Sequence, residues 1–338
     1  MTTTTVASSL QGLLDQNAHF ALQARGTTNH CPMALVALAK MGAGPARLQA
    51  FFAYWTTRYA IARDPHPGSL KRQEWQARAG DSEAFGSLRL LFTDWIAAEG
   101  VAAVVATVLA QAAPAPATGA FHALIRLAYG LEADHGGEVA AGLAAYVANQ
   151  LLIPLGDAAS RPAESVAAGL HTLSRQFAGK TWPGQAITAR LRGVAADPLF
   201  LASLPRPPQS GDLLAQLAHA AIALYWQTSN FTVLHMVTGV HAARLVMARL
   251  PAATVRIQSE ALWAAYCAAY VSVGAPALAD DDPPAAPTDW ATLLALAVDA
   301  DDDHTIKLVY SCWQEDAHAA NPAYLAAAAR LLHGRRGA

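Results

Sequence analysis

The chain has 338 residues, 54% of them hydrophobic, with 23 Lys and Arg against 25 Asp and Glu and a formal net charge of −2. The hydrophobic share is ample for a large core and excludes a disordered protein. The balanced charge, without a dense basic stripe, argues against nucleic acid as a partner.

The cysteines and the N-terminus indicate the compartment. Cys31, Cys267 and Cys312 are few, odd in number and far apart, so we expect a reducing environment and no disulfide framework. The N-terminus lacks the basic residues and apolar core of a signal peptide. The longest apolar run, 101–110, is shorter than the about 20 residues that cross a bilayer. We expect a cytoplasmic protein without a membrane partner, and leave its oligomeric state open.

Helix signals dominate from one end of the chain to the other. Ala and Leu recur with helical spacing, whereas the Val, Ile and Thr runs typical of strands are nearly absent. We predict an all-α fold, a single multi-helix domain over residues 1–338 built from helical hairpins around a buried histidine cluster. Residues 205–212 mark a candidate lobe boundary, and the acidic, proline-rich stretch 279–288 a loop. Further turn signals separate the helical stretches at 42–45, 65–68, 114–116 and 136–137.

Four of the 12 histidines open similar helical segments, namely His30, His122, His235 and His304. Each segment is followed by a second expected helix, near 45–60, 138–150, 257–271 and 322–332 respectively. Such helix pairs can stack around a shared core. The alternative is that any Ala- and Leu-rich helical protein shows echoes of this kind.

Taken singly, each of these histidines is an ordinary residue of a capped first turn, because Asn29 and the acidic residues 301–303 are good N-caps. Four in matching contexts favour a buried metal site, since neutral imidazole is the usual ligand of Zn, Fe, Cu and Ni. His241 follows His235 by six residues, about 240° around a helix. We therefore assign His235 as a ligand and His241 as a catalytic residue that supports the ligands or contacts substrate.

Lys307 lies three residues after His304 and hence on the same helix face. An ammonium beside a metal would be repelled, whereas a neutral amine could be tolerated. A carbamate formed with carbon dioxide would act as a carboxylate ligand. The alternative is a lysine that covers apolar surface and reaches solvent with its ammonium.

Two alternatives compete with the histidine site. Glu132-x-x-His135 and Glu315-x-x-His318 match the motif of di-iron carboxylate oxygenases, although both lie where their helices are expected to end. The chain could also be a non-catalytic helical scaffold whose histidines form core hydrogen bonds. The sequence contains no Gly-rich phosphate loop, Cys-x-x-Cys or Gly-x-Ser-x-Gly.

Four segments together resemble the questin oxidase-like family over residues 15–335. They are 29–35 (NHCPMAL), 121–126 (FHALIR), 231–238 (FTVLHMVT) and 303–308 (DHTIKL). The resemblance implies a helical oxidoreductase of aromatic polyketide pathways that cleaves anthraquinone or related rings, in some members as a Baeyer–Villiger-type oxidase. It also implies a mononuclear non-haem iron site. Its ligands would be His30, His122, His235, His304 and a modified Lys307.

We therefore expect an oxygenase that uses Fe(II) and dioxygen on a small aromatic substrate, such as a hydroquinone or anthraquinone. The reaction would be oxygen insertion or ring C–C cleavage. Arg126, one turn after His122, is expected to bind a substrate oxygen, with an inter-helix or surface ion pair as its alternative. The need for a reductant such as NADPH and the carboxylation of Lys307 are left open.

Overall fold

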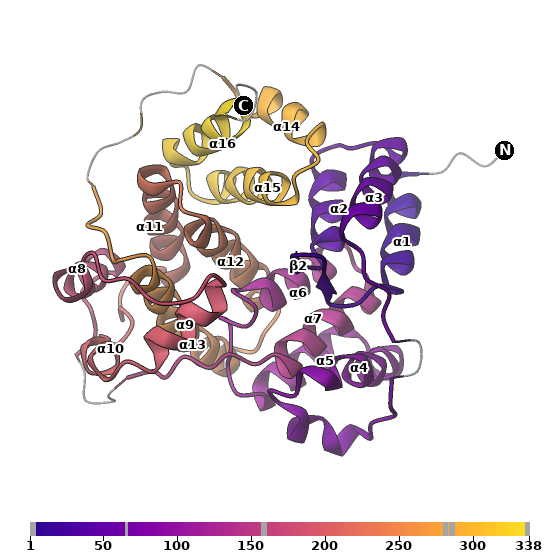
Figure 1. The fold of residues 1–338 in the computed structure, drawn as a ribbon, viewed down its shortest axis with the longest axis horizontal. Helices are drawn as coiled ribbons and strands as arrows, with labels where there is room; N and C mark the ends of the chain where they lie inside the picture. Colours follow the sequence, from indigo (N-terminus) through magenta and orange to yellow (C-terminus); the bar gives the residue numbers. More distant parts are fainter. Residues whose placement is uncertain (1–4, 65–66, 157–160, 280–282, 284–287, 335–338) are drawn as a thin grey trace.

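The structure is a computed structural model that describes residues 5–64, 67–156, 161–279, 283 and 288–334 (Figure 1). The predicted all-α class is confirmed, because helices account for nearly all regular structure in these ranges. The elements are α1 (Val6–Asn17), β1 (Gln23–Ala24), β2 (Thr27–Thr28), α2 (Cys31–Lys40), α3 (Pro45–Tyr59), η1 (Arg72–Arg78), η2 (Ser82–Ala84), α4 (Phe85–Glu99), α5 (Val101–Gln111), α6 (His122–Glu132), α7 (Gly136–Ala148), α8 (Val166–Phe177), α9 (Ile187–Ala195), α10 (Pro198–Ser203), α11 (Leu213–Thr228), α12 (Phe231–Met247), α13 (Ala252–Ser272), α14 (Trp290–Val298), α15 (Asp303–His318) and α16 (Pro322–Gly334).

Four helices from distant parts of the chain form a closed ring of neighbours. Helix α2 packs against α6, α6 against α12, α12 against α15, and α15 against α2. They lie around the middle of the view in Figure 1, with the other helices outside them. Each of the four carries one of the histidines singled out from the sequence, so this ring decides where those histidines meet.

The predicted second helices of the hairpins are present. They are α3, α7, α13 and α16, each starting within a few residues of its expected position. Helix α15 continues through Asp316 and ends at His318, where the sequence predicts its end. A Glu-Asp-Ala sequence carries no helix breaker, and the turn comes only at Asn321-Pro322.

Glycines bring α6 and α7 into close contact. A Cβ on Gly142 would lie 2.6 Å from the backbone of Leu127, and one on Gly130 would lie 2.8 Å from the backbone nitrogen of Val139. Helix α7 is buried from Glu138 to its end at Ala148. This close packing against α7 positions α6, whose first residue is His122.

A small hairpin, β1 paired antiparallel with β2, is the one exception to the all-helical expectation among the described residues. Gly26 takes a positive φ of 73° in its turn, which glycine adopts without strain. Two β-branched threonines follow. Such short strands leave no periodic signal in a sequence.

The predicted loop 205–212 separates α10 from α11, whereas most of 279–288 lies outside the described residues. No helix in the described ranges is long and apolar enough to cross a membrane. The single domain over residues 1–338 stays a prediction.

Candidate metal centre

The starts of the ring helices place the histidines. His30 directly precedes α2, His122 is the first residue of α6, His304 the second of α15, and His235 lies one turn inside α12. Helix α15 starts where it does because the Asp302 carboxylate accepts the backbone N–H of Thr305 at 2.7 Å. Three residues before α6, at 119–121, have left-handed backbone with φ of 60°, 56° and 70°. This turn aims His122 inward.

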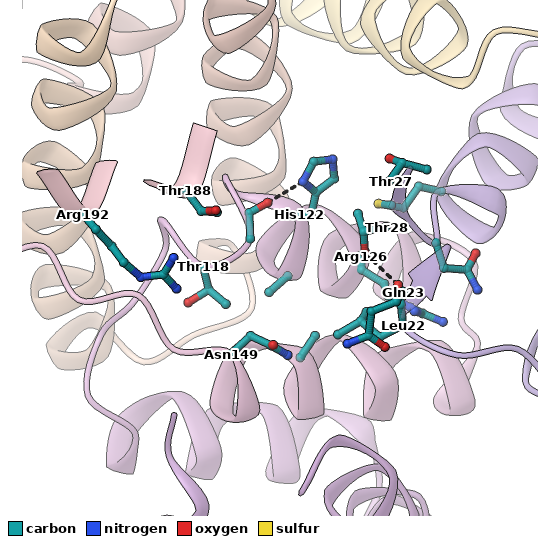
Figure 2. Close-up of a pocket in the computed structure, with 15 residues that line it drawn as sticks. Leu22, Gln23, Thr27, Thr28, Thr118, His122, Arg126, Asn149, Thr188 and Arg192 are labelled. Atoms are coloured by element: carbon teal, nitrogen blue, oxygen red, sulfur yellow. Dashed lines mark hydrogen bonds between the residues drawn. The ribbon is translucent and has the colours of Figure 1, made fainter. Parts of the chain in front are cut away.

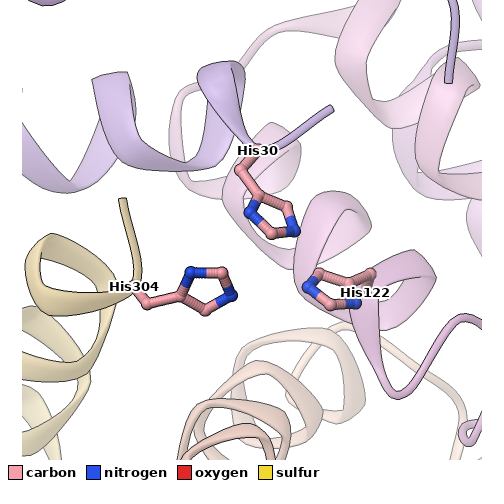
Figure 3. A group of neighbouring side chains, drawn as sticks. All are labelled: His30, His122 and His304. Carbon is pink, nitrogen blue, oxygen red and sulfur yellow. The ribbon is translucent and has the colours of Figure 1, made fainter. Parts of the chain in front are cut away.

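The four imidazoles converge. One ring nitrogen from each of His30, His122 and His304 lies within 4.8 Å of the others (Figure 3). The Nε2 atoms of His122 and His235 are 3.3 Å apart, and the ring centroids of His235 and His304 are 5.2 Å apart. Chain segments separated by as many as 273 residues thus meet at one point.

Each histidine uses its Nδ1 atom in a hydrogen bond to the protein. His30 and His304 donate to the same Asp303 oxygen, at 2.9 and 2.8 Å. His235 donates to the carbonyl of Phe231 at 2.7 Å, and His122 to that of Gly119. Since carbonyl and carboxylate oxygens only accept, all four Nδ1 atoms carry the proton and the neutral rings present bare Nε2 atoms.

The Nε2 atoms have no partner of their own. Those of His30 and His304 are buried without any hydrogen bond. Those of His122 and His235 face each other as two acceptors, 3.3 Å apart with no proton between them. A buried polar atom without a partner is costly, so this arrangement calls for a cation at the centre.

Burial keeps the imidazoles neutral. Burial, aided by nearby Lys307, lowers the pKa of His30 to about 4. Burial and the neighbouring imidazoles hold the pKa of His122 well below its usual value, and burial with His304 and Lys307 does the same for His235. The pKa of His304 is also lowered, chiefly by burial. Neutral imidazole is the form that binds metals.

Asp303 is the anion of the centre. Burial alone would raise the pKa of its carboxyl, but the histidines and Lys307 around it bring the pKa well below the usual value. Its second oxygen accepts the indole N–H of Trp55 at 3.3 Å. Asp303 thus orients two of the four imidazoles, as carboxylates behind metal-binding histidines commonly do.

Lys307 is buried, with 1% of its surface exposed. Its Nζ lies 3.9 Å from an Asp303 oxygen, and its charge acts on the pKa of all four histidines. The alternative of a lysine that reaches solvent is therefore wrong. Burial lowers the pKa of its amine, with Asp303 and Asp302 opposing.

A cavity of about 220 Å³ adjoins the centre (Figure 2). His122 and Arg126 of α6 form part of its wall. Apolar atoms come from Leu22, Met33 and Ala123, and polar groups from several threonines and Asn149. On the side of the centre formed by α12, Phe231 is 53% exposed, and its ring lies 4.7 Å from those of both His235 and His304, centroid to centroid.

The two residues predicted to act on substrate are each paired with a buried glutamate. Arg126 reaches the cavity wall, but its guanidinium makes a buried ion pair with Glu138 at 2.8 and 3.2 Å, which matches its inter-helix alternative. His241 donates from Nδ1 to Glu315 at 3.1 Å and packs on Tyr310, and it is not among the cavity residues. Its catalytic role gains no support from this placement.

The residues of the di-iron alternative are engaged elsewhere. Glu132 accepts the phenol O–H of Tyr310, and His135 accepts the backbone N–H of Glu138. Glu315 is paired with Arg244, which also contacts His318. In the described part of the chain, the side chains spaced for one metal ion are His30, His122 and His304. The di-iron alternative therefore has no assembled site.

The model of the questin oxidase-like family matches residues 27–312. The chain belongs to that family. The match confirms the resemblance seen in the four histidine segments, and the family description indicates an oxidase, hence an oxidoreductase. A comparison with curated proteins finds none that matches the chain.

Sequence reasoning missed one part of the centre. Asp303 was assigned only to helix capping, although its position beside His304 and four residues before Lys307 is a usable signal. Phe231, which begins α12 one turn before His235, is one of four aromatic residues near the histidines that the sequence offers as walls for a flat substrate, with core packing as the alternative; the others are Phe121, Tyr129 and Trp226.

Proposed function

We propose that this protein is a mononuclear non-haem iron-dependent oxygenase that acts on an aromatic polyketide of the anthraquinone or hydroquinone type. The family match supports an oxidase acting on polyketide-type substrates. The observation that carries the metal assignment is the pair of bare Nε2 atoms on His122 and His235, 3.3 Å apart. Two imidazoles bound to one ion at about 2.1 Å have nitrogens roughly 3.0–3.4 Å apart, so the residues fit a single ion.

His30, His122, His235 and His304 would hold the metal through Nε2, with their Nδ1 protons fixed by Asp303 and two backbone carbonyls. Iron bound there would supply the activation of dioxygen that oxygen insertion or ring C–C cleavage needs. The protein's own contribution is to keep the imidazoles neutral, to exclude water, and to present the aromatic ring from the cavity beside His122.

Lys307 fits a role as a carbamate ligand. The positive ends of α2, α6 and α15 point toward the centre together with the cation, and Asp303 provides one negative charge against them. A buried amine with a lowered pKa is a nucleophile for carbon dioxide. Its nitrogen would bond to the carbon, lose a proton and become an anionic carbamate, which offsets the excess positive charge.

Metal analysis of protein prepared without oxygen tests the proposal. We expect about one iron per chain, lost in His304→Ala and retained in His171→Ala, which removes an exposed histidine of α8. Iron-loaded protein should then consume oxygen when hydroquinones or anthraquinones are added. A protein that binds no Fe(II), Mn(II) or Zn(II) would instead be the helical scaffold.

The lysine needs its own comparison. Lys307→Glu should retain more iron than Lys307→Met, because the glutamate carries a carboxylate on a shorter chain. Wild-type protein in ¹³C-bicarbonate should show a carbamate carbon signal that Lys307→Met lacks. Equal iron in the two variants and no such signal would rule out the carbamate.

A further inference from the structure

The cavity beside His122 has an uneven charge. Its 15 lining residues include Arg126 and Arg192 and no aspartate or glutamate. Arg126 is neutralised by Glu138 behind the wall. The guanidinium of Arg192, from α9, makes no hydrogen bond or ion pair with the described residues, although that of Arg190 on the same helix makes several hydrogen bonds. Among the described residues, the positive charge of Arg192, an exposed residue at the cavity, therefore has no carboxylate partner.

Further donors line the same cavity. The side-chain nitrogen of Asn149, at the end of α7, is buried and has no hydrogen-bond partner. Thr118 accepts the backbone N–H of Leu151 through its hydroxyl oxygen at 3.1 Å, which leaves its own O–H free to donate. Figure 2 shows Arg192 pointing into the cavity from the side where Thr118 lies, with Asn149 below. Donors of this kind match an acceptor that is anionic.

Apolar side chains also line the cavity. They include Met33 and Ala123, and His122 connects the cavity to the metal centre. The volume of about 220 Å³ is below the roughly 300–1,000 Å³ of drug-sized ligand sites. The space suits a small ring body with one charged end.

We infer that this cavity recognises a small aromatic acid, whose carboxylate or phenolate oxygen is bound by Arg192, Asn149 and Thr118 while its ring lies beside His122. The inference rests on the proposed function for the ring's role as substrate, and it narrows the substrate class to anionic aromatic compounds. Arg192 is a specificity residue in this assignment, because it selects the charged end and leaves the chemistry to the centre.

Binding of two matched probes tests the inference without any turnover. The probes are 2-naphthoate and 2-naphthamide, which share a ring and differ in the anionic oxygen, titrated calorimetrically into the full chain as purified. We expect the acid to bind about tenfold more tightly than the amide, the size of one charge-assisted hydrogen bond. The preference should fall to about onefold in Arg192→Gln and persist in Arg175→Gln, which removes an exposed arginine of α8. Asn149→Ala should weaken the acid more than the amide.

Three results would overturn the inference: equal binding of acid and amide, no binding of either, or a preference that survives in Arg192→Gln. The outcome is independent of the metal. A preference that depends on Arg192 in a protein without iron would support this cavity assignment while contradicting the oxygenase. Stoichiometric iron with no preference for the acid would do the reverse.

Discussion

Two sets of polar side chains are buried in the same helical core, and they differ in whether their polar atoms all have hydrogen-bond partners. The carboxylates of Glu138 and Glu315 each form an ion pair with an arginine. The four central histidines form hydrogen bonds to the protein only through Nδ1. Their Nε2 atoms have no protein partner among the described residues except one another. A satisfied buried network holds a fold together, whereas an unsatisfied one points to a missing ligand.

The largest expected effect on stability comes from breaking one of the two buried ion pairs. Arg126→Met leaves the buried Glu138 carboxylate without its main partner, and should lower the free energy of unfolding by about 3–5 kcal/mol. Denaturant titration of metal-free protein measures this, with Arg175→Met as the exposed control. His304→Ala in the same metal-free state should cost less, about 1–2 kcal/mol, because it removes one hydrogen bond to an Asp303 oxygen that His30 still satisfies, and its Nε2 satisfies nothing. Similar losses of unfolding free energy in Arg126→Met and His304→Ala would contradict the distinction between the paired glutamates and the central histidines.

The next effect separates orientation from ligation. Asp303→Asn replaces a carboxylate that accepts from two imidazoles with an amide that also has donors to place. We expect iron affinity, measured by competition with a chelator, to fall about 10–100-fold. Asp94→Asn, an exposed change on α4, should leave the affinity unchanged. Unaltered affinity in Asp303→Asn would mean that the four imidazoles are held without it.

Gly239→Ala tests whether packing alone aims a ligand. A Cβ at this position of α12 would lie 2.9 Å from Cγ of Phe121, the residue before His122. We expect a loss of about 1–3 kcal/mol from overpacking, together with weaker iron binding. Gly12→Ala is the matched control, because a Cβ there meets nothing within 4 Å. It should stabilise α1 by about 0.5–1 kcal/mol.

The smallest effect concerns pH. Burial would raise the pKa of Glu315, but hydrogen bonds from His241 and Arg244 bring it down to about 2. Because the folded pKa is below the unfolded value of about 4.3, the pair stabilises the protein above that pH and loses its contribution as pH falls toward 2. Glu315→Gln should cost about 1 kcal/mol at pH 7, since Arg244 is partly exposed and Asp212 lies 3.9 Å away.

The same variant should also flatten the decline in stability below pH 4.5. Thermal melts across that range measure it, beside the exposed control Glu164→Gln. A decline as steep as in the wild type would show that Glu315 is not responsible.

The sequence by itself determined the helical class and the positions of the ring helices. Ala- and Leu-rich periodicity and local turn signals set where a helix begins, and these are short-range effects. For the same reason His30, His122 and His304 could be placed at helix starts, and the second helix of each hairpin could be located.

Tertiary structure alone decided what those residues contact. The sequence indicated only a capping role for Asp303. The packing of α15 against α2 brings it into a hydrogen bond with His30, 273 positions away. The sequence left open whether the Lys307 amine reaches solvent or the histidine centre, and the packing of the ring helices buries it. Arg126 lines the cavity, but its guanidinium forms an ion pair with Glu138. Burial and partners depend on elements distant in the chain, which no local pattern records.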